Sequence, residues 1–135
     1  MKIKGRIKTN RSFKKKIGQL PEMADSLVRN RLFDIANTAI EFSQPFVQSG
    51  AYITSFSFNT AAGRPRGYTL HGRPVADRNE RAGVGLRQLI DDINRIQDFS
   101  NKSTLYLRNN APHAYPVELN YRVFAQIKNI EVVYG

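Results

Sequence analysis

A short alternating strand that runs directly into a turn, within residues 103–119, constrains the fold of this chain more than any other feature. Leu105 and Leu107 share one face of this strand and Tyr106 lies on the other, as the two-residue period of a pleated strand requires. The next four residues, 109–112, read Asn-Asn-Ala-Pro. Asparagine tolerates left-handed backbone angles and proline fixes φ, so we expect a packed corner where the strand ends.

Two amphipathic helices are predicted upstream of this strand. Over residues 21–42 the apolar positions recur at spacings of three and four, which places them on one helix face: Ala24, Leu27, Val28, Leu32, Ile35, Ala36, Ala39 and Phe42. Pro45 ends this helix. A second apolar stripe predicts a helix over residues 84–98, although Gly83 and Gly85 weaken its start.

The other segments predict a strand, a loop and an arm. Residues 52–58 alternate as a second strand. Residues 59–82 contain five glycine or proline residues among arginines, and we expect a long basic loop or a wide hairpin tip there. Residues 1–18 are interpreted as a basic extended arm. The apolar spacing of residues 122–134 fits a helix as well as a strand, and both alternatives stay open.

A chain of 135 residues has the length of one ordinary domain. We therefore predict a single α+β domain over residues 19–135, with a small, mainly antiparallel sheet packed by the long N-terminal amphipathic helix, a second helix and the long basic loop. The absence of cysteine excludes disulfides and thiolate zinc sites. The apolar runs fall far short of the roughly 20 residues that cross a bilayer, so we expect no membrane partner.

The net charge of +10 is concentrated in two segments. Residues 1–16 carry eight lysines and arginines and no acid, and residues 59–88 carry six arginines against two acids. Such charge favours contact with DNA or with acidic protein surfaces, or serves solubility alone, and these three alternatives stay open. The candidate contacts to DNA or to an acidic partner are Lys14, Lys15, Lys16, Arg64, Arg66, Arg73, Arg78 and Arg81.

No group of residues predicts an enzyme, a cofactor site or a metal site. His71 and His113 lie among turn residues without a histidine or an acid at ligand spacing, and we interpret both as turn histidines. Asp91 and Asp92 are adjacent, so on a helix they point about 100° apart, and we expect a solvated helix face. The run at residues 63–67 lacks the Gly-Lys-Ser/Thr ending of a phosphate-binding loop.

Two segments carry a resemblance to a known family. Residues 44–52 read Gln-Pro-Phe-Val-Gln-Ser-Gly-Ala-Tyr, and residues 109–118 read Asn-Asn-Ala-Pro-His-Ala-Tyr-Pro-Val-Glu. Across roughly residues 20–119 the chain resembles the neck or tail-completion proteins of tailed bacteriophages, a family of head–tail joining and minor tail proteins. In that family a long amphipathic helix ends in a Pro-Val-Asp-Thr-Gly-like turn, and a later strand precedes Asn-Asn-x-Pro-Tyr-Ala-x-x-x-Glu. The matching positions are Ser49, Gly50, Asn110, Ala111, Pro112, Ala114 and Glu118.

The chain departs from the family pattern at three places. Phe46-Val47-Gln48 replaces Val-Asp, so a possible turn-capping aspartate is missing. His113 stands where tyrosine is usual, and Asn120 replaces a glycine. These changes affect the backbone geometry of the turns and leave the order of the elements unchanged.

The resemblance implies a structural virion protein of the head–tail junction, made in the host cytoplasm, that performs no chemistry. It implies a homo-oligomeric ring of sixfold or twelvefold symmetry that passes DNA and joins portal, adaptor or stopper proteins to the tail terminator or tail tube. Glu118 would accept backbone N–H groups of the turn or an arginine, and an exposed glutamate is the alternative. Two other functions stay open: a free-standing basic protein that binds nucleic acid non-specifically, and a small nuclease that uses His71 or His113.

Overall fold

The computed structural model describes residues 3–8, 24–46, 51–60, 78–96 and 105–134, together with the single positions 15 and 19. Four strands form one antiparallel sheet in the order β2-β3-β1-β4: β1 (Ile3–Ile7), β2 (Phe56–Thr60), β3 (Leu105–Asn109) and β4 (Ile130–Tyr134). The helices within the described ranges are α2 (Ala24–Ser43), α3 (Arg78–Arg95), α4 (Ala114–Tyr121) and α5 (Val123–Gln126), and a 3-10 turn, η2 (Gln44–Phe46), follows α2. The predicted α+β class with an antiparallel sheet is confirmed.

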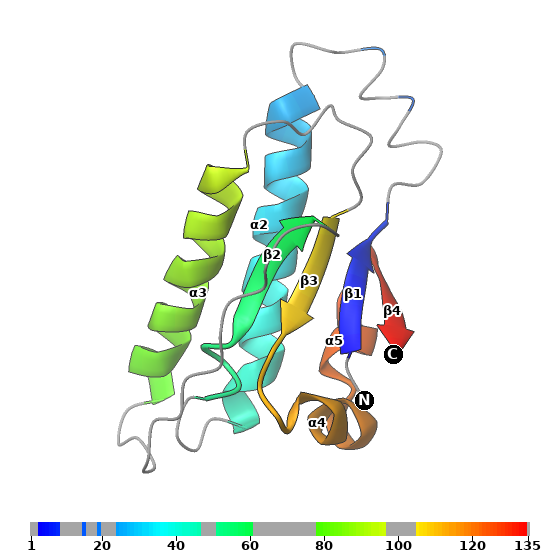
Figure 1. The fold of residues 1–135 in the computed structure, drawn as a ribbon. Coiled ribbons are helices and arrows are strands. Elements are labelled where there is room, and N and C mark those ends of the chain that lie inside the picture. The colour runs from blue at the N-terminus through cyan, green and yellow to red at the C-terminus, as the bar shows by residue number, and fades with distance from the viewer. Residues whose placement is uncertain are drawn as a thin grey trace.

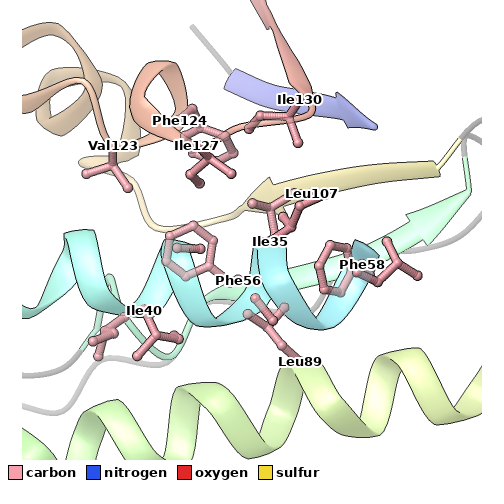
Figure 2. Close-up of a cluster of buried hydrophobic side chains, with 14 of the residues drawn as sticks. Ile35, Ile40, Phe56, Phe58, Leu89, Leu107, Val123, Phe124, Ile127 and Ile130 are labelled. Atoms are coloured by element: carbon pink, nitrogen blue, oxygen red, sulfur yellow. The ribbon is translucent and has the colours of Figure 1, made fainter. Parts of the chain in front are cut away.

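One face of the sheet is apolar and is covered by helices (Figure 1). Side chains on this face alternate along each strand with side chains on the other, because successive residues of a strand point to opposite sides. Figure 2 shows Ile35 of α2, Leu89 of α3 and two residues of the sheet, Phe56 and Leu107, within one cluster of buried side chains. Residues from α5, its C-cap and β4 complete the same cluster: Val123, Phe124, Ile127 and Ile130.

Helices α2 and α3 pack against each other in antiparallel orientation. The Arg29 guanidinium of α2 donates from Nη1 to the carbonyl of Ile93 (3.0 Å) and from Nη2 to the carbonyl of Ile96 (3.1 Å), at the carboxyl end of α3. At the other end of the pair, Gly85 of α3 lies beside Ile40 of α2. The cation therefore satisfies terminal carbonyls of α3 and fixes the pairing of the two helices.

The helix predicted over residues 21–42 overlaps α2, whose described span begins at Ala24. It is not the first element, because β1 precedes it. The helix predicted over residues 84–98 starts earlier than expected, at Arg78, and continues through Gly83 and Gly85, although both lower helix propensity. Residues 122–134 contain both alternatives left open by the sequence, since α5 is followed by β4.

Residues 3–7 lie in the interior of the sheet, between β3 and β4, and not in an arm outside the domain. Ile3 and Ile7 are buried beneath the helices, and Gly5 leaves room for Phe124 and Ile130 to approach the strand. The expected boundary at residue 18 therefore does not hold for β1. Most of residues 9–18 lies outside the described residues.

The predicted loop at residues 59–82 is shorter than expected. Asn59 and Thr60 belong to β2, and residues 78–82 form the first turns of α3. Residues 61–77 lie outside the described part of the chain, so the remainder of that prediction stays a prediction.

Asp92 protects the β2 edge of the sheet. Its carboxylate, 8% exposed, accepts the backbone N–H of Phe58 through Oδ2 at 3.1 Å. This N–H donates to α3 and not to β3, so it lies on the outer edge of β2. Without Asp92 it would be an unpaired donor that another strand could bind. The expectation that Asp91 and Asp92 form a solvated face is correct for Asp91, which is exposed, and wrong for Asp92.

We expect Asp92→Ala to lower the free energy of unfolding by about 2 kcal/mol, because a buried backbone donor loses a charged acceptor. The neighbouring exposed Asp91→Ala is the matched control, with an expected change within about 0.5 kcal/mol. Urea denaturation of the two variants measures the difference. Equal midpoints for the two variants would contradict this role of Asp92.

Candidate functional site

The Asn-Asn-Ala-Pro turn docks onto the turn that precedes β2. Asn109 Oδ1 accepts the backbone N–H of Ala111 at 3.0 Å, and its Nδ2 donates to the carbonyl of Tyr52 at 2.8 Å. The backbone N–H of Asn110 donates to the carbonyl of Ser55 at 3.3 Å. The two motif segments therefore meet at one corner of the sheet, although Ser49 and Gly50 themselves lie outside the described residues.

Glu118 is buried and acts as the acceptor for the start of α5. It is 1% exposed, which excludes the exposed alternative. Its Oε2 accepts the backbone N–H of Phe124 at 2.7 Å and its Oε1 accepts that of Ala125 at 2.9 Å. The N–H groups belong to α5 and not to the Asn-Asn-Ala-Pro turn. Between α4 and α5 the chain reverses at Arg122, which has a left-handed φ of 52°.

Tyr52 fills the space between this corner and the core. Its ring meets Phe56 edge-on with centroids 5.2 Å apart, and the ring of His113 lies 5.9 Å away. Burial, and then the negative charge of Glu118, raises the pKa of the Tyr52 hydroxyl well above its usual range. Partial burial lowers the pKa of His113, so its neutral form is favoured.

The polar side chains of this corner hold main-chain segments in place. Both carboxylate oxygens of Glu118 are engaged by backbone donors, and the Asn109 side chain bridges two segments of main chain. His113 packs on an aromatic ring, as the interpretation of a turn histidine predicts. Within the described residues, no cluster of histidine and carboxylate side chains has a geometry that could hold a metal ion.

Three of the predicted basic contacts lie at described positions, and two of these, Arg78 and Arg81, are one turn apart on α3. Lys15 is an exposed helical position, and Arg78 starts α3. Arg81 lies in the second turn of α3, partly buried, with its Nε unpaired within this set of residues. The other predicted contacts lie outside the described ranges: Lys14, Lys16, Arg64, Arg66 and Arg73.

Two surfaces that the sequence did not predict stand out. The first, here named the α4–β4 surface, consists of Tyr115, Leu119 and Tyr134. Tyr115 and Leu119 are four residues apart on α4 and so share one helix face, and Tyr115 meets Tyr134 of β4 edge-on with centroids 6.2 Å apart. Leu119 is 58% exposed and Tyr134 is 53% exposed. An apolar surface of this kind is typical of a protein contact.

The second surface, here named the outer sheet face, is the side of the sheet opposite the helices. In the strand register Lys4 lies opposite Arg108, and Arg6 lies opposite Tyr106 and Glu131. These side chains are exposed or partly exposed, whereas Ser57 and Asn59 on the β2 end of the same face are buried. The basic side chains of this face therefore lie on β1 and β3, whereas β4 contributes Glu131 and Val133.

Comparisons with protein-family models, with curated proteins and with solved structures gave no match for this chain. In the part of the chain that the structure describes, no helix combines the length and the hydropathy needed to span a membrane.

Proposed function

We propose that this chain is a structural subunit of the neck of a tailed bacteriophage, a tail-completion protein that assembles into a closed ring at the head–tail junction. In this role it performs no catalysis. The ring, of six or twelve copies, joins portal, adaptor or stopper proteins to the tail terminator or tail tube and passes DNA through its channel. The sequence resemblance motivates the family, and the surface described next supports the assembly.

The observation that carries this proposal is the position of the α4–β4 surface. Leu119 and Tyr134 of this surface, together with Tyr121 of α4, are the three large apolar side chains that are exposed among the described residues. Tyr134 belongs to the edge strand β4, which pairs only with β1 in the described sheet, and its ring meets Tyr115 of α4 edge-on. An open strand edge beside apolar side chains suits the addition of another copy of the chain.

The two edges of the sheet differ in a way that bears on ring closure. Asp92 occupies the outward N–H of Phe58 on β2, so a simple chain of β4-to-β2 pairings between subunits is disfavoured. A ring requires a heterologous contact, in which the α4–β4 surface meets a different surface of the next copy. A symmetrical β4-to-β4 dimer is the competing arrangement, and it would not propagate into a ring.

The corner residues support a framework role. Asn109, at the start of the Asn-Asn-Ala-Pro turn, and Glu118, a position matched to the family pattern, hold turns and α5 in place through hydrogen bonds to the main chain. A subunit of a ring needs such a rigid corner, because α4 and β4 must present one fixed surface to the neighbouring subunit.

Native mass spectrometry of the full chain tests ring formation. We expect a closed species of six or twelve times the 15.4 kDa mass of one chain. Leu119→Glu places a charge in the proposed contact and should shift the population to monomers, by a factor of at least about ten in assembly constant. Asn37→Glu, at an exposed position of α2, is the matched control and should keep the ring.

Four results would contradict the proposal or its proposed contact surface. A wild-type chain that stays monomeric at every concentration, and binds duplex DNA as a monomer, favours the free-standing nucleic-acid-binding protein. A dimer as the largest species favours the β4-to-β4 arrangement. A ring that Leu119→Glu leaves intact removes the α4–β4 surface from the contact. Cleavage of DNA that is abolished by His113→Ala or His71→Ala would instead identify a nuclease.

A further inference from the structure

We propose that the outer sheet face binds the phosphodiester backbone of duplex DNA, with Lys4 and Arg108 as the phosphate contacts and Tyr106 as the residue that positions them. This surface is separate from the basic arm and loop that the sequence singled out. The inference does not depend on the proposed ring, because it concerns the sheet face of a single subunit.

The arrangement of the two cations around one ring is the first observation. Lys4 Nζ lies 4.6 Å from the centroid of the Tyr106 ring, and the guanidinium carbon of Arg108 lies 5.2 Å from the same centroid. Each cation is attracted to the negative face of the aromatic ring. Tyr106 therefore draws together two flexible side chains that come from neighbouring strands, and reduces the freedom that each would lose on binding a ligand.

The second observation is an uncompensated charge. Lys4 and Arg108 are directly opposite in the antiparallel register of β1 and β3, a placement in which like charges repel. Across the same face Arg6 is paired with Glu131, with 2.7 Å between Nη2 and Oε2. Within the described ranges Lys4 and Arg108 have no carboxylate at ion-pair distance. An anion between the two cations would relieve the repulsion.

The chemistry of the two cations favours phosphate. The planar fork of Arg108 can donate two parallel hydrogen bonds to a phosphate, and the lysine ammonium adds a point charge beside it. Because both cations already lie over the tyrosine ring, the ring is not an open platform for a stacked base. We therefore expect the outer sheet face to contact the charged phosphates of DNA and not to distinguish base sequences. Duplex DNA carries one negative charge per about 1.7 Å of axis, so several phosphates face a surface that spans three strands.

Fluorescence anisotropy with a labelled duplex of arbitrary sequence tests the proposal. We expect the double variant Lys4→Gln/Arg108→Gln to weaken binding about tenfold or more and to lower the slope of log affinity against log salt by about 2. The charge-matched control is Arg87→Gln/Lys128→Gln, which removes two exposed cations from α3 and from the segment before β4. It should change the affinity less than threefold, as expected for cations outside the contact.

Tyr106 gives a readout that distinguishes positioning from a general loss of structure. Tyr106→Phe keeps the aromatic face and should bind as the wild type does, whereas Tyr106→Leu removes it and should weaken binding with an unchanged thermal midpoint.

Equal affinities for the double variant and its charge-matched control would overturn the proposal. So would tighter binding of poly-glutamate than of a duplex of equal charge, since that identifies an acidic protein as the partner. The oligomeric state of each variant, measured separately, shows whether the ring persists, so failure of one proposal does not imply failure of the other.

Discussion

Glu118→Ala should lower the free energy of unfolding by about 3 kcal/mol, because two backbone N–H groups at the start of α5 lose a charged acceptor in the interior. The hydrogen bonds to Phe124 and Ala125 are 2.7 and 2.9 Å long, and the carboxylate is 1% exposed. Without these bonds α5 has no side-chain acceptor in place for those donors, and Phe124 is drawn away from the core. Chemical denaturation monitored by circular dichroism measures the change.

Two further variants sharpen this test. Glu118→Gln keeps one acceptor oxygen and the side-chain volume, so we expect about half of the loss. Glu131→Ala removes a glutamate of the same type that is exposed and paired with Arg6, and it should cost at most about 1 kcal/mol. If Glu118→Ala were no more damaging than Glu131→Ala, the proposed support of α5 by Glu118 would be wrong.

Gly85→Ala should lower the free energy of unfolding by about 3 kcal/mol, although alanine is the better helix former. A Cβ at this position would overlap the backbone carbonyl of Ile53 and would lie 3.0 Å from Ile40 Cδ1. Because the first of these is a backbone atom, α3 itself would have to move away from the turn before β2.

Gly83 provides the matched control on the same helix. A Cβ built there meets nothing within 4 Å, so Gly83→Ala should raise the free energy of unfolding by up to about 1 kcal/mol through helix propensity. The two alanine variants should therefore shift the thermal midpoint in opposite directions. A stabilising Gly85→Ala would show that α3 does not pack closely on the turn at residues 51–54.

The elements with a strong local period were the ones that the sequence could predict. The apolar stripe of α2 repeats over a few helical turns, and the alternation of β3 extends over a few residues, so both patterns are local. Each of the two elements lies close to its predicted span. The sequence does not predict β1, because Gly5 occupies the middle of its buried face and only Ile3 and Ile7 carry the alternating pattern. The early start of α3 was missed because local propensity assigns Gly83 and Gly85 a cost and cannot show that Gly85 permits a close contact.

The candidate site was only partly predictable, because its contacts join segments that are far apart in the sequence. The acid at position 118 was singled out by the family pattern, but its acceptor role depends on the left-handed turn at Arg122, which brings α5 back to it. The role of Asp92 depends on β2 lying beside α3, a contact between segments about 34 residues apart. The α4–β4 surface and the outer sheet face are defined by what remains exposed after folding, and no local pattern reports that.

Electron cryomicroscopy of tailed particles assembled with this chain is the most direct test of a ring at the head–tail junction. We predict a closed ring of six or twelve copies, in which Leu119 and Tyr134 of each copy are buried against the next. Particles that lack the chain, or a ring in which these two side chains remain exposed to solvent, would contradict that prediction.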